Sequence, residues 1–409
     1  MLVANEQKGL LGELMAMLGE SLDITESEFD VAVKSYEAVG SWLSRGESLL
    51  APYKPVIKPQ GSFLIGTMTR PVNGKDELDI DLVCQLTGKR AGWSQYQLKQ
   101  IVGDQLKNHA TYRKMLKSPD GRRCWTLPFD NMIRYHMDIL PAIISHGFFL
   151  LREKSLSSIE TTDFENLAIS ITDRLRQDYY TSTDSGLWLK SNPEGYAKWF
   201  FQRAVSSADR LFSLKDAIKP VPQYQRRKLP LQVVVQLFKR HRDMMFNGDD
   251  DKPISIIITT LAAKIYNKEQ NIFEALMKIA FAMADNIEER YDSESGKTVK
   301  WVGNPVNNQE NFADKWRNEP KKAENFYSWL HKLQWDLRNL SQEKQGLNFV
   351  RENMITSFGR SEVDKTFSAY GDKQFDLRNV GQQFMQAGSG ILGSAGIPVK
   401  NHNFHGNGQ

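Results

Sequence analysis

Cysteine is scarce in this chain of 409 residues, which contains only Cys84 and Cys124. The two do not form a CxxC pair, and there is no further cysteine to complete a disulfide framework. A disulfide-stapled fold and a cysteine-based zinc site are therefore excluded, and we expect the protein to act in a reducing cytoplasm.

Long hydrophobic runs are also missing. Among the most apolar stretches is ISIIITTLAA, residues 254–263, which is far too short to cross a bilayer. The N-terminal sequence MLVANEQKGLLGELMAML lacks the basic region followed by an apolar core that marks a signal peptide. We therefore expect neither a signal peptide nor a membrane partner.

Neither sign of charge is in large excess. Lys and Arg number 53 and Asp and Glu number 49, and the chain is 40% hydrophobic and 25% charged, as in ordinary soluble globular proteins. The slight basic tilt suits phosphate-bearing ligands but does not require a long nucleic acid. The length is sufficient for two domains, each with a sizeable core.

Three common site patterns are excluded by their surroundings. The sequence GSGILG, residues 388–393, fits GxGxxG, but no predicted strand precedes it and no βαβ unit surrounds it. A Gly-Lys pair is followed by Asp76 rather than by Ser or Thr, so it is not a P-loop. His402 and His405 have a metal-like spacing, but they stand in a polar, Gly-rich tail without further ligands.

The first part of the chain is predicted to mix helices and strands. Thr25 and Glu28 have the spacing of a capping box, at the start of a helix whose apolar residues recur at helical spacing. The elements expected are helix within residues 1–48, an extended segment at 53–60, a strand at 79–86, a helix at 95–116 and a strand at 133–140 that Pro141 ends.

After about residue 160 the pattern becomes helical. Helices are expected at residues 229–245, 254–266, 273–284, 322–343 and 361–386, with a long polar loop at 291–310. We divide the chain into residues 1–160, 161–386 and a flexible C-terminal tail at 387–409.

The stretch GKDELDIDLV, residues 74–83, alternates carboxylates with aliphatic side chains. Residues two apart in a strand share a face, so Asp79 and Asp81 project together while the aliphatic residues face the core. Two adjacent carboxylates repel each other and are costly to desolvate, and a divalent cation such as Mg²⁺ reverses that cost. Taken alone, the pattern also fits an edge strand with a solvated polar face.

Two further features stand in order around this strand. Upstream, QGSFLIGTMTRP places Gly61 and Ser62 at a turn into a short helix, where backbone N–H groups and a hydroxyl can approach a phosphate. Downstream, Asp138 lies on the polar face of the second predicted strand and completes a group of three carboxylates. This order resembles the signature of the DNA polymerase β-like nucleotidyltransferases.

A narrower resemblance covers most of residues 50–375. The segments SNPEGYAKWF, LPLQVVVQLFKRHRD, KPISIIITTLAA and NPVNNQENFADKW are similar to those of the bacterial cyclic-oligonucleotide synthases of anti-phage signalling, the CD-NTases. The resemblance implies an α+β, bilobal nucleotidyltransferase fold. A mixed β-sheet with flanking helices and a C-terminal helical lobe would enclose the active site in the cleft between them, and a helix at about residues 25–45 would run along the back of both lobes.

The resemblance also implies roles for the three aspartates. Asp79 and Asp81 would hold two Mg²⁺ ions, with Mn²⁺ as a substitute, and Asp138 would bind the second ion and help orient the nucleophile. Gly61 and Ser62 would cradle the β- and γ-phosphates. Gln60 could reach the same phosphates, or it could be an ordinary residue before the turn.

Residues of the helical lobe are carried over in the same way. Lys239 would contact the triphosphate and so would Ser255, which alternatively is only the first residue of a helix. The neighbouring Arg240 and Arg242 are interpreted as solvated charges, as are Arg226, Arg227 and Lys228. Tyr196 and Trp199 either stack on a nucleobase or pack between the lobes, and Asn192 is open in the same way.

The function that the resemblance implies is Mg²⁺-dependent polymerisation and cyclisation of ATP and other NTPs into a cyclic di- or trinucleotide. This second messenger would activate an effector protein in anti-phage defence. The alternatives are a linear oligoadenylate synthase, a nucleotidyltransferase that modifies RNA or protein, and an inactive nucleotide-binding module. The C-terminal tail could join a regulatory or conjugation partner, but it ends in Gln409 rather than in a small residue.

Overall fold

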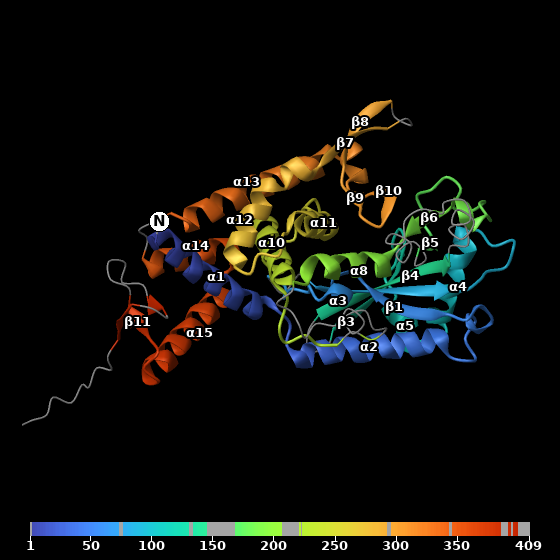
Figure 1. The fold of residues 1–409 in the computed structure, drawn as a ribbon. Coiled ribbons are helices and arrows are strands. Elements are labelled where there is room, and N and C mark those ends of the chain that lie inside the picture. The colour runs from blue at the N-terminus through green and yellow to red at the C-terminus, as the bar shows by residue number, and fades with distance from the viewer. Residues whose placement is uncertain are drawn as a thin grey trace, which may run out of the picture.

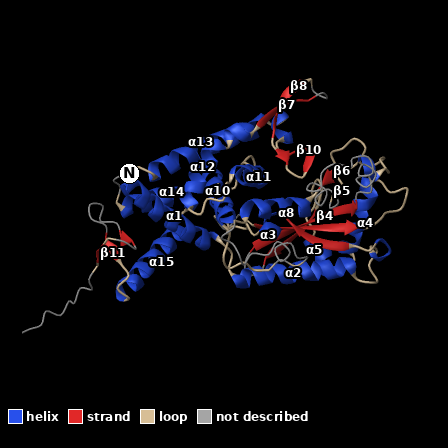
Figure 2. Ribbon diagram, viewed as in Figure 1, coloured by secondary structure: helices blue, strands red, loops and turns tan. Residues whose placement is uncertain are grey.

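The structure of the protein is a computed structural model. It describes residues 2–72, 77–130, 134–144, 168–206, 221, 223–292, 296–342, 346–385, 392–393 and 396–399. Most strands gather at one end of the molecule and most helices at the other (Figures 1 and 2). The two ends correspond to two large hydrophobic cores, so the chain has a sheet lobe and a helical lobe.

The sheet lobe is built on a six-stranded mixed sheet with the order β1-β2-β4-β5-β6, in which β3 also pairs with β4. Its strands are β1 (Val56–Gln60), β2 (Leu78–Leu86), β3 (Trp125–Asp130), β4 (Arg134–Ile144), β5 (Ile169–Ile171) and β6 (Leu189–Ser191). The two long strands predicted from alternation are thus confirmed, whereas β3, β5 and β6 were not predicted. Because β5 and β6 follow residue 160, the sheet extends past the expected domain boundary.

The central strands β2 and β4 are parallel neighbours. Side chains facing the core alternate with polar ones in both, as at Tyr135, Met137 and Ile139 of β4, which are fully buried. Pro141 does not end β4, contrary to prediction. The pairing of β4 with β3 ends at Ile139, and its pairing with β5 begins at Ala142. Pro141 lies between these two positions, so the backbone N–H that proline lacks is not needed where the neighbouring strand changes.

Helices cover the sheet and close its core. α2 (Glu26–Ser44) packs on β1, β2 and α4 (Gln95–Lys107), and α5 (Ala110–Met115) follows α4 after a short break within the helix predicted at 95–116. The capping box is confirmed at the start of α2, since Thr25 accepts a hydrogen bond from the Glu28 N–H and the Glu28 carboxylate accepts one from the Thr25 N–H. The short η1 (Ala51–Tyr53) leads into β1.

The helical lobe contains α1 (Leu2–Leu22), α8 (Pro193–Ala204), α10 (Pro230–Phe246), α11 (Ser255–Ile265), α12 (Ile272–Ala282), α13 (Pro320–Leu340), α14 (Leu347–Phe358) and α15 (Arg360–Asn379). The five helices predicted after residue 160 correspond to α10, α11, α12, α13 and α15. The β-branched run at the start of α11 is helical because Ile257, Ile258 and Leu261 are all buried in the helical core, and packing overrides propensity.

Among the residues that the structure describes, no single helix runs along the back of both lobes. α1 packs on α10, α12 and α15 of the helical lobe, while α2 packs on the sheet lobe (Figure 1). The two lobes are joined instead at α3 (Gly61–Ile65), where Phe63 is buried in the sheet core and Leu64 and Ile65 are buried in the helical core. The expectation for residues 25–45 was therefore wrong.

The polar segment at residues 291–310 is not a loop. It contains the hairpins β7–β8 (Glu288–Asp292, Lys297–Trp301) and β9–β10 (Gly303–Asn304, Asn307–Asn311). Cross-strand hydrogen bonds and ion pairs such as Glu289–Lys300 take the place of a hydrophobic alternation, so the pattern gave no strand signal. The short η3 (Ala284–Asn286) and η4 (Asp314–Arg317) flank these hairpins.

The predicted flexible tail is described only in part. Residues Leu392–Gly393 (β12) and Ile397–Pro398 (β13) pair with β11 (Phe384–Met385), so this portion forms a small sheet. Residues 400–409, the Gly-Lys pair before Asp76 and the expected boundary at residue 160 lie outside the described residues. Within the described part of the chain, we find no helix with the length and apolarity needed to span a bilayer.

Candidate active site

A large cavity of about 940 Å³ lies where the two lobes face each other. Its walls come from the loop around α3, from β2 and β4, from the start of α8, from α10 and α11 with the loop between them, and from the β9–β10 hairpin. Predicted site residues that line it are Gln60, Gly61, Ser62, Asp79, Asp81, Asn192, Tyr196, Lys239 and Ser255. Asp138 is the predicted site residue that does not line it.

The strand register brings the three aspartates to one face of the sheet. Asp81 of β2 stands directly beside Asp138 of β4, and Asp79 stands beside His136. Side chains at paired positions of parallel neighbours share a face, and the strands are roughly 4.8 Å apart. Asp138 is therefore on the same side of the sheet as Asp79 and Asp81.

Asp81 has surroundings that suit a cation. Burial in the cleft, together with the neighbouring Asp79 and Asp138 carboxylates, raises the pKa of Asp81 to about 7. A half-buried carboxylate between two others is stabilised by a bound positive charge, and carboxylate oxygens are the ligands that Mg²⁺ prefers. The residues present at this position therefore fit a divalent metal ion.

Asp79 is held by a residue that the sequence did not single out. The Nε2 atom of His136 lies 2.9 Å from the Asp79 carboxylate, while Nδ1 lies 3.3 Å from Glu77. Burial acts to raise the pKa of Asp79, but the hydrogen bond and charge of His136 outweigh it and lower that pKa. The same contact raises the pKa of His136 to about 9 against the effect of burial. The imidazolium thus neutralises Asp79.

Asp138 accepts a hydrogen bond from a neighbouring strand of the same sheet. The Thr126 hydroxyl of β3 donates to Asp138 Oδ1 at 2.5 Å, across the β3–β4 pair. In the described residues no three His, Cys, Asp or Glu side chains stand close enough together to hold a metal ion as they are placed. Joint coordination by the three aspartates would therefore require a change in the placement of these side chains.

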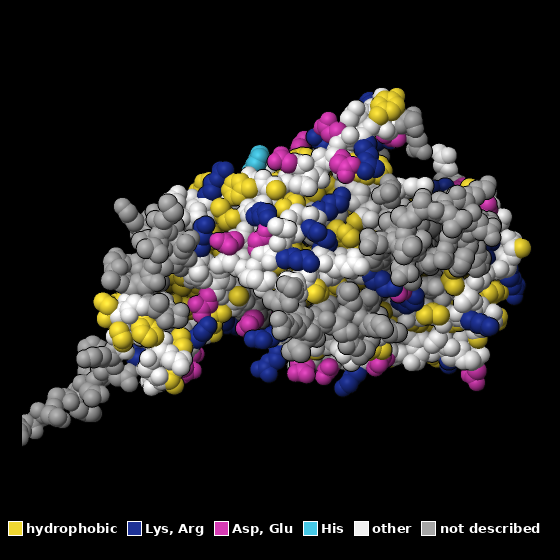
Figure 3. All heavy atoms as spheres, viewed as in Figure 1, with side chains coloured by type: hydrophobic (Ala, Val, Ile, Leu, Met, Phe, Trp, Pro, Cys, Tyr) yellow, Lys and Arg dark blue, Asp and Glu magenta, His cyan; other side chains and the backbone are white. Residues whose placement is uncertain are grey.

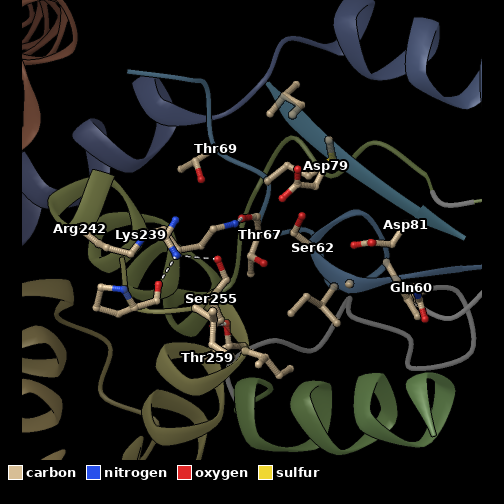
Figure 4. Close-up of a pocket in the computed structure, with 18 of the residues that line it drawn as sticks. Gln60, Ser62, Thr67, Thr69, Asp79, Asp81, Lys239, Arg242, Ser255 and Thr259 are labelled. Atoms are coloured by element: carbon tan, nitrogen blue, oxygen red, sulfur yellow. Dashed lines mark hydrogen bonds between the residues drawn. The ribbon is translucent and has the colours of Figure 1, made fainter. Parts of the chain in front are cut away.

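The turn at Gly61 lies against the same carboxylates. Gly61 has a positive φ of 63°, which an L-residue with a side chain rarely adopts, and a Cβ built there would collide with Asp81 Oδ2. Ser62 opens α3 next to it, and its carbonyl accepts the N–H groups of Gly66 and Thr67. Figure 4 shows Ser62 between Asp79 and Asp81 on the cavity wall.

Three cationic or hydroxyl side chains of α10 and α11 face these residues (Figure 4). Lys239 is buried and donates to the Thr67 carbonyl at 2.8 Å, so α10 is tied to the α3 loop. Burial and the nearby Arg242 lower the pKa of Lys239 to about 8. Arg242 donates to the Ser255 hydroxyl at 2.7 Å and to the Pro253 carbonyl at 3.0 Å. This wall therefore presents positive charge to an anion.

The prediction that Arg240 and Arg242 are solvated charges was wrong. Both are buried, because the helix that carries them is enclosed on all sides. Arg240 donates to the Phe358 carbonyl and to Glu362, and so joins α10 to α14 and α15. By contrast, Arg226 and Arg227 are exposed as expected, while Lys228 pairs with Asp23 at 3.2 Å.

The start of α8 forms a further wall. Asn192 is the N-cap residue, and its side chain accepts the Gly195 N–H at 2.9 Å. Tyr196 is largely buried, and its hydroxyl lies 2.9 Å from the Thr260 hydroxyl of α11. Trp199 packs against the helical core and does not line the cavity. Tyr196 thus packs between α8 and α11 and also lines the cavity, while its stacking on a nucleobase stays a prediction.

Other cavity residues were missed by sequence reasoning. They include Thr67, Thr69, Arg70, His136, Arg242, Lys252, Thr259, Asn304, Glu310 and Phe312. His136 could have been found, because it stands two residues before Asp138 on the same predicted strand face. Asn304, Glu310 and Phe312 lie in NPVNNQENFADKW, one of the segments that resemble the CD-NTases, but the sequence analysis predicted a loop there and gave these residues no role in the site.

The chain resembles known proteins over different spans. Residues 55–141 match the family model described as cyclic GMP-AMP synthase DncV-like, nucleotidyltransferase domain. A protein of Roseivirga ehrenbergii named c-di-GMP synthase is 26% identical over 99% of this chain and 100% of its own length. The Bradyrhizobium diazoefficiens cyclic dinucleotide synthase CdnG is 23% identical over 94% of this chain and 91% of its own length.

The fold is similar as well. The structure of the Bradyrhizobium diazoefficiens CD-NTase CdnG in complex with GTP superposes with a TM-score of 0.61 at 20% identity, over 88% of this chain and 99% of that one. The domain match, the relatives along the whole chain and the shared fold agree. Residues 55–141 therefore resemble a DncV-like nucleotidyltransferase domain, and the whole chain is similar in sequence to cyclic dinucleotide synthases and shares the fold of a CD-NTase.

Proposed function

We propose that this protein is a nucleotidyltransferase that joins NTPs and closes the product into a cyclic di- or trinucleotide. The observation that supports this most directly is the register that sets Asp81 beside Asp138 on the face shared with Asp79, next to the Gly61–Ser62 turn. Both whole-chain relatives are named as cyclic dinucleotide synthases.

In this proposal, one group of cavity residues binds the triphosphate and another group binds the metal ions. Lys239, Arg242 and Ser255 bind and orient the triphosphate, and the N–H groups and hydroxyl at the Gly61–Ser62 turn hold its outer phosphates. Asp79, Asp81 and Asp138 would hold two Mg²⁺ or Mn²⁺ ions. Such ions, when bound, stabilise the attacking and leaving oxygens of an in-line displacement and acidify the attacking hydroxyl.

In the proposed reaction a ribose hydroxyl of one nucleotide attacks the α-phosphate of another. The new phosphodiester bond forms as the bond to pyrophosphate breaks, and the hydroxyl proton leaves to a base or to solvent. A second displacement within the linear intermediate closes the ring. The cavity volume of about 940 Å³ is large enough for more than one nucleotide.

Other activities of the same fold make different products. A linear oligoadenylate synthase would leave terminal phosphates, and an inactive binding module would release no pyrophosphate. A nucleotidyltransferase acting on long RNA would use a continuous basic groove. On the described surface seen in Figure 3, Lys and Arg side chains are interspersed with Asp and Glu, which favours small nucleotides as substrates.

We further propose that the protein works in the cytoplasm and that its product signals to an effector protein in anti-phage defence. A regulatory or conjugation partner at the C-terminal tail is part of the same proposal. The resemblance to the CD-NTases supports these partners.

Mass spectrometry of the products from an equimolar mixture of four NTPs with Mg²⁺ tests this function. We expect a product that lacks terminal phosphates and whose mass does not change on phosphatase treatment. A product that loses phosphate on treatment would show a linear synthase. The absence of any product under these conditions would overturn the proposal.

A further inference from the structure

The chain between the Gly61–Ser62 turn and the strand that carries Asp79 has no regular structure after α3. From the end of α3 at Ile65, the described residues as far as 72 form neither helix nor strand. We call residues 65–71 the connecting segment. Its cavity-lining residues are Ile65, Thr67, Met68, Thr69, Arg70 and Pro71. Its conformation therefore affects how the phosphate-binding turn lies relative to the carboxylates of β2.

Side chains of α10 bind the backbone carbonyl groups of the connecting segment. The hydrogen bonds run from Gln232 to Ile65 at 2.8 Å, from Gln236 to Met68 at 2.7 Å, from Lys239 to Thr67 at 2.8 Å and from Arg240 to Arg70 at 3.2 Å. Donors with this spacing lie on one face of a helix. Because a buried carbonyl is costly to leave unpaired, this face of α10 restricts the conformation of the segment.

Three of the four donors have a second task. Gln232 also accepts a backbone N–H at the start of α10. Lys239, which lies beside Thr67 in Figure 4, is assigned to the triphosphate in the proposed function. Arg240 also joins α10 to α14 and α15. The contact of Gln236 with the segment therefore needs an explanation of its own.

Gln236 is completely buried and is held from two sides. Its Nε2 donates to the Met68 carbonyl at 2.7 Å and to the Asp23 carboxylate at 3.2 Å. Asp23 lies between α1 and α2 and is itself held by an ion pair with Lys228 at 3.2 Å. Since a carbonyl oxygen can only accept, the amide nitrogen of Gln236 must face Met68.

Stability alone does not explain a glutamine at this position. Within the described part of the chain, the buried Oε1 of Gln236 has no hydrogen-bond partner. An unpaired buried acceptor costs free energy that an apolar side chain of the same length would not cost. The amide is therefore best explained by its donor, which fixes the Met68 carbonyl.

We propose that Gln236 is a positioning residue for the proposed reaction. Its amide, oriented by Asp23, holds the Met68 carbonyl and with it the connecting segment, so that the Gly61–Ser62 turn and Asp79 keep the separation that an in-line displacement requires. Gln236 is not among the described residues that line the cavity, so it acts without touching a nucleotide. The inference rests on the proposed function for the reaction, while the hold on the segment is measurable without turnover.

Two substitutions at Gln236 separate positioning from packing. Gln236→Met keeps the length of the side chain but has no donor. Gln236→Lys keeps a donor for the Met68 carbonyl and brings a charge to Asp23, as the buried Lys239 does for Thr67. A packing role would make the methionine variant the more active of the two, because it buries no charge. A positioning role predicts the reverse order.

The first readout is single-turnover pyrophosphate release at saturating NTP and Mg²⁺. We expect Gln236→Met to be roughly 10- to 100-fold slower than the wild type, because small displacements of reacting groups are costly, and Gln236→Lys to recover most of that loss. The affinity of a non-hydrolysable NTP analogue should change by less than about threefold in both, because the phosphate-binding side chains are unaltered.

The matched control is Gln105→Met. Gln105 is also buried, on α4, and its amide bonds the Leu49 N–H and the Trp42 carbonyl, both at 3.0 Å and outside the cavity lining. Urea denaturation should show that this variant loses stability, but its rate of pyrophosphate release should match that of the wild type.

Amide hydrogen exchange followed by mass spectrometry measures the hold on the connecting segment without turnover. We expect exchange within residues 65–71 to be faster in Gln236→Met and restored in Gln236→Lys, with no change there in the control. The inference is overturned if Gln236→Met leaves this exchange unchanged, or if it is as active as the wild type. A wild type that releases no pyrophosphate would refute the proposed function, while faster exchange in Gln236→Met would still support the hold of Gln236 on the segment.

Discussion

Asp79 and Asp81 are two positions apart on one strand, yet their surroundings move their pKa values in opposite directions. His136 lowers the pKa of Asp79 in spite of burial, whereas burial and two neighbouring carboxylates raise the pKa of Asp81 to about 7. Asp79, paired with His136, is therefore ionised at neutral pH without a bound metal ion. Asp81 becomes fully ionised there only with added positive charge, which is what a divalent ion would supply.

Lys239 gives a prediction about pH. Its pKa of about 8 means that it carries its charge at pH 7 and loses it as the pH rises through that value. We expect a non-hydrolysable NTP analogue to bind about tenfold more weakly at pH 9 than at pH 7, because a charge-assisted hydrogen bond to phosphate is lost. Calorimetric titration across this range measures the effect.

The control for this titration is Lys239→Met, which has no charge to lose. It should bind weakly at pH 7 and lose most of the slope of the wild type, keeping only the part due to His136, whose pKa is about 9. If the variant kept the slope of the wild type, another group would be responsible and Lys239 would not contact the phosphates.

The sequence identified some residues of the candidate site and missed others. Asp79 and Asp81 share a face because they are two positions apart in one strand, whereas the Gly61–Ser62 turn and Asp138 were identified from their order along the chain, and all of them lie on or next to the cavity. The roles of His136 and Arg242 depend on partners from other elements. Arg242 in particular was taken for a solvated charge, because a run of basic residues on a helix is usually exposed.

At the scale of elements, α10 connects the phosphate wall to the rest of the helical lobe. It carries Lys239 toward the cavity and Arg240 toward α14 and α15, where Arg240 donates to Phe358 and Glu362. The sequence predicted this helix closely but not its burial, since Lys239 and Arg240 bond to groups more than a hundred positions away and Arg242 bonds to Asp243 and to the segment that follows α10. Strands β7–β10 were missed for a related reason, because polar hairpins lack an apolar alternation.

Arg240→Met should destabilise the protein. It leaves the buried Glu362 carboxylate without its partner, which costs about 3–5 kcal/mol of the free energy of unfolding. Urea denaturation measures this loss. The exposed Arg226→Met should change stability by less than about 0.5 kcal/mol.

The double variant Arg240→Met with Glu362→Leu should recover part of the loss, because no uncompensated charge then remains. An Arg240→Met protein as stable as the wild type would show that this ion pair does not join α10 to α15.

At the scale of the whole molecule, the cavity exists because two separately packed lobes meet at α3. The sheet lobe supplies the carboxylates, and the helical lobe supplies the cations and the β9–β10 hairpin. The sequence predicted two lobes and the cleft between them through its resemblance to a family. It could not predict that α1 and α2 belong to different lobes, because both have an ordinary apolar stripe and only tertiary packing assigns each to its core.

The measurement that tests the central claim most directly is single-turnover pyrophosphate release with Mg²⁺ by the wild type and by Asp79→Asn, Asp81→Asn and Asp138→Asn. Asp104→Asn is the matched control, since Asp104 is exposed on α4 away from the cavity. Each of the three site variants should keep its fold by circular dichroism and lose roughly 100-fold or more in rate, while the control matches the wild type. Folded variants of Asp81 and Asp138 that release pyrophosphate within a few-fold of the wild type would contradict a shared metal site at these strands.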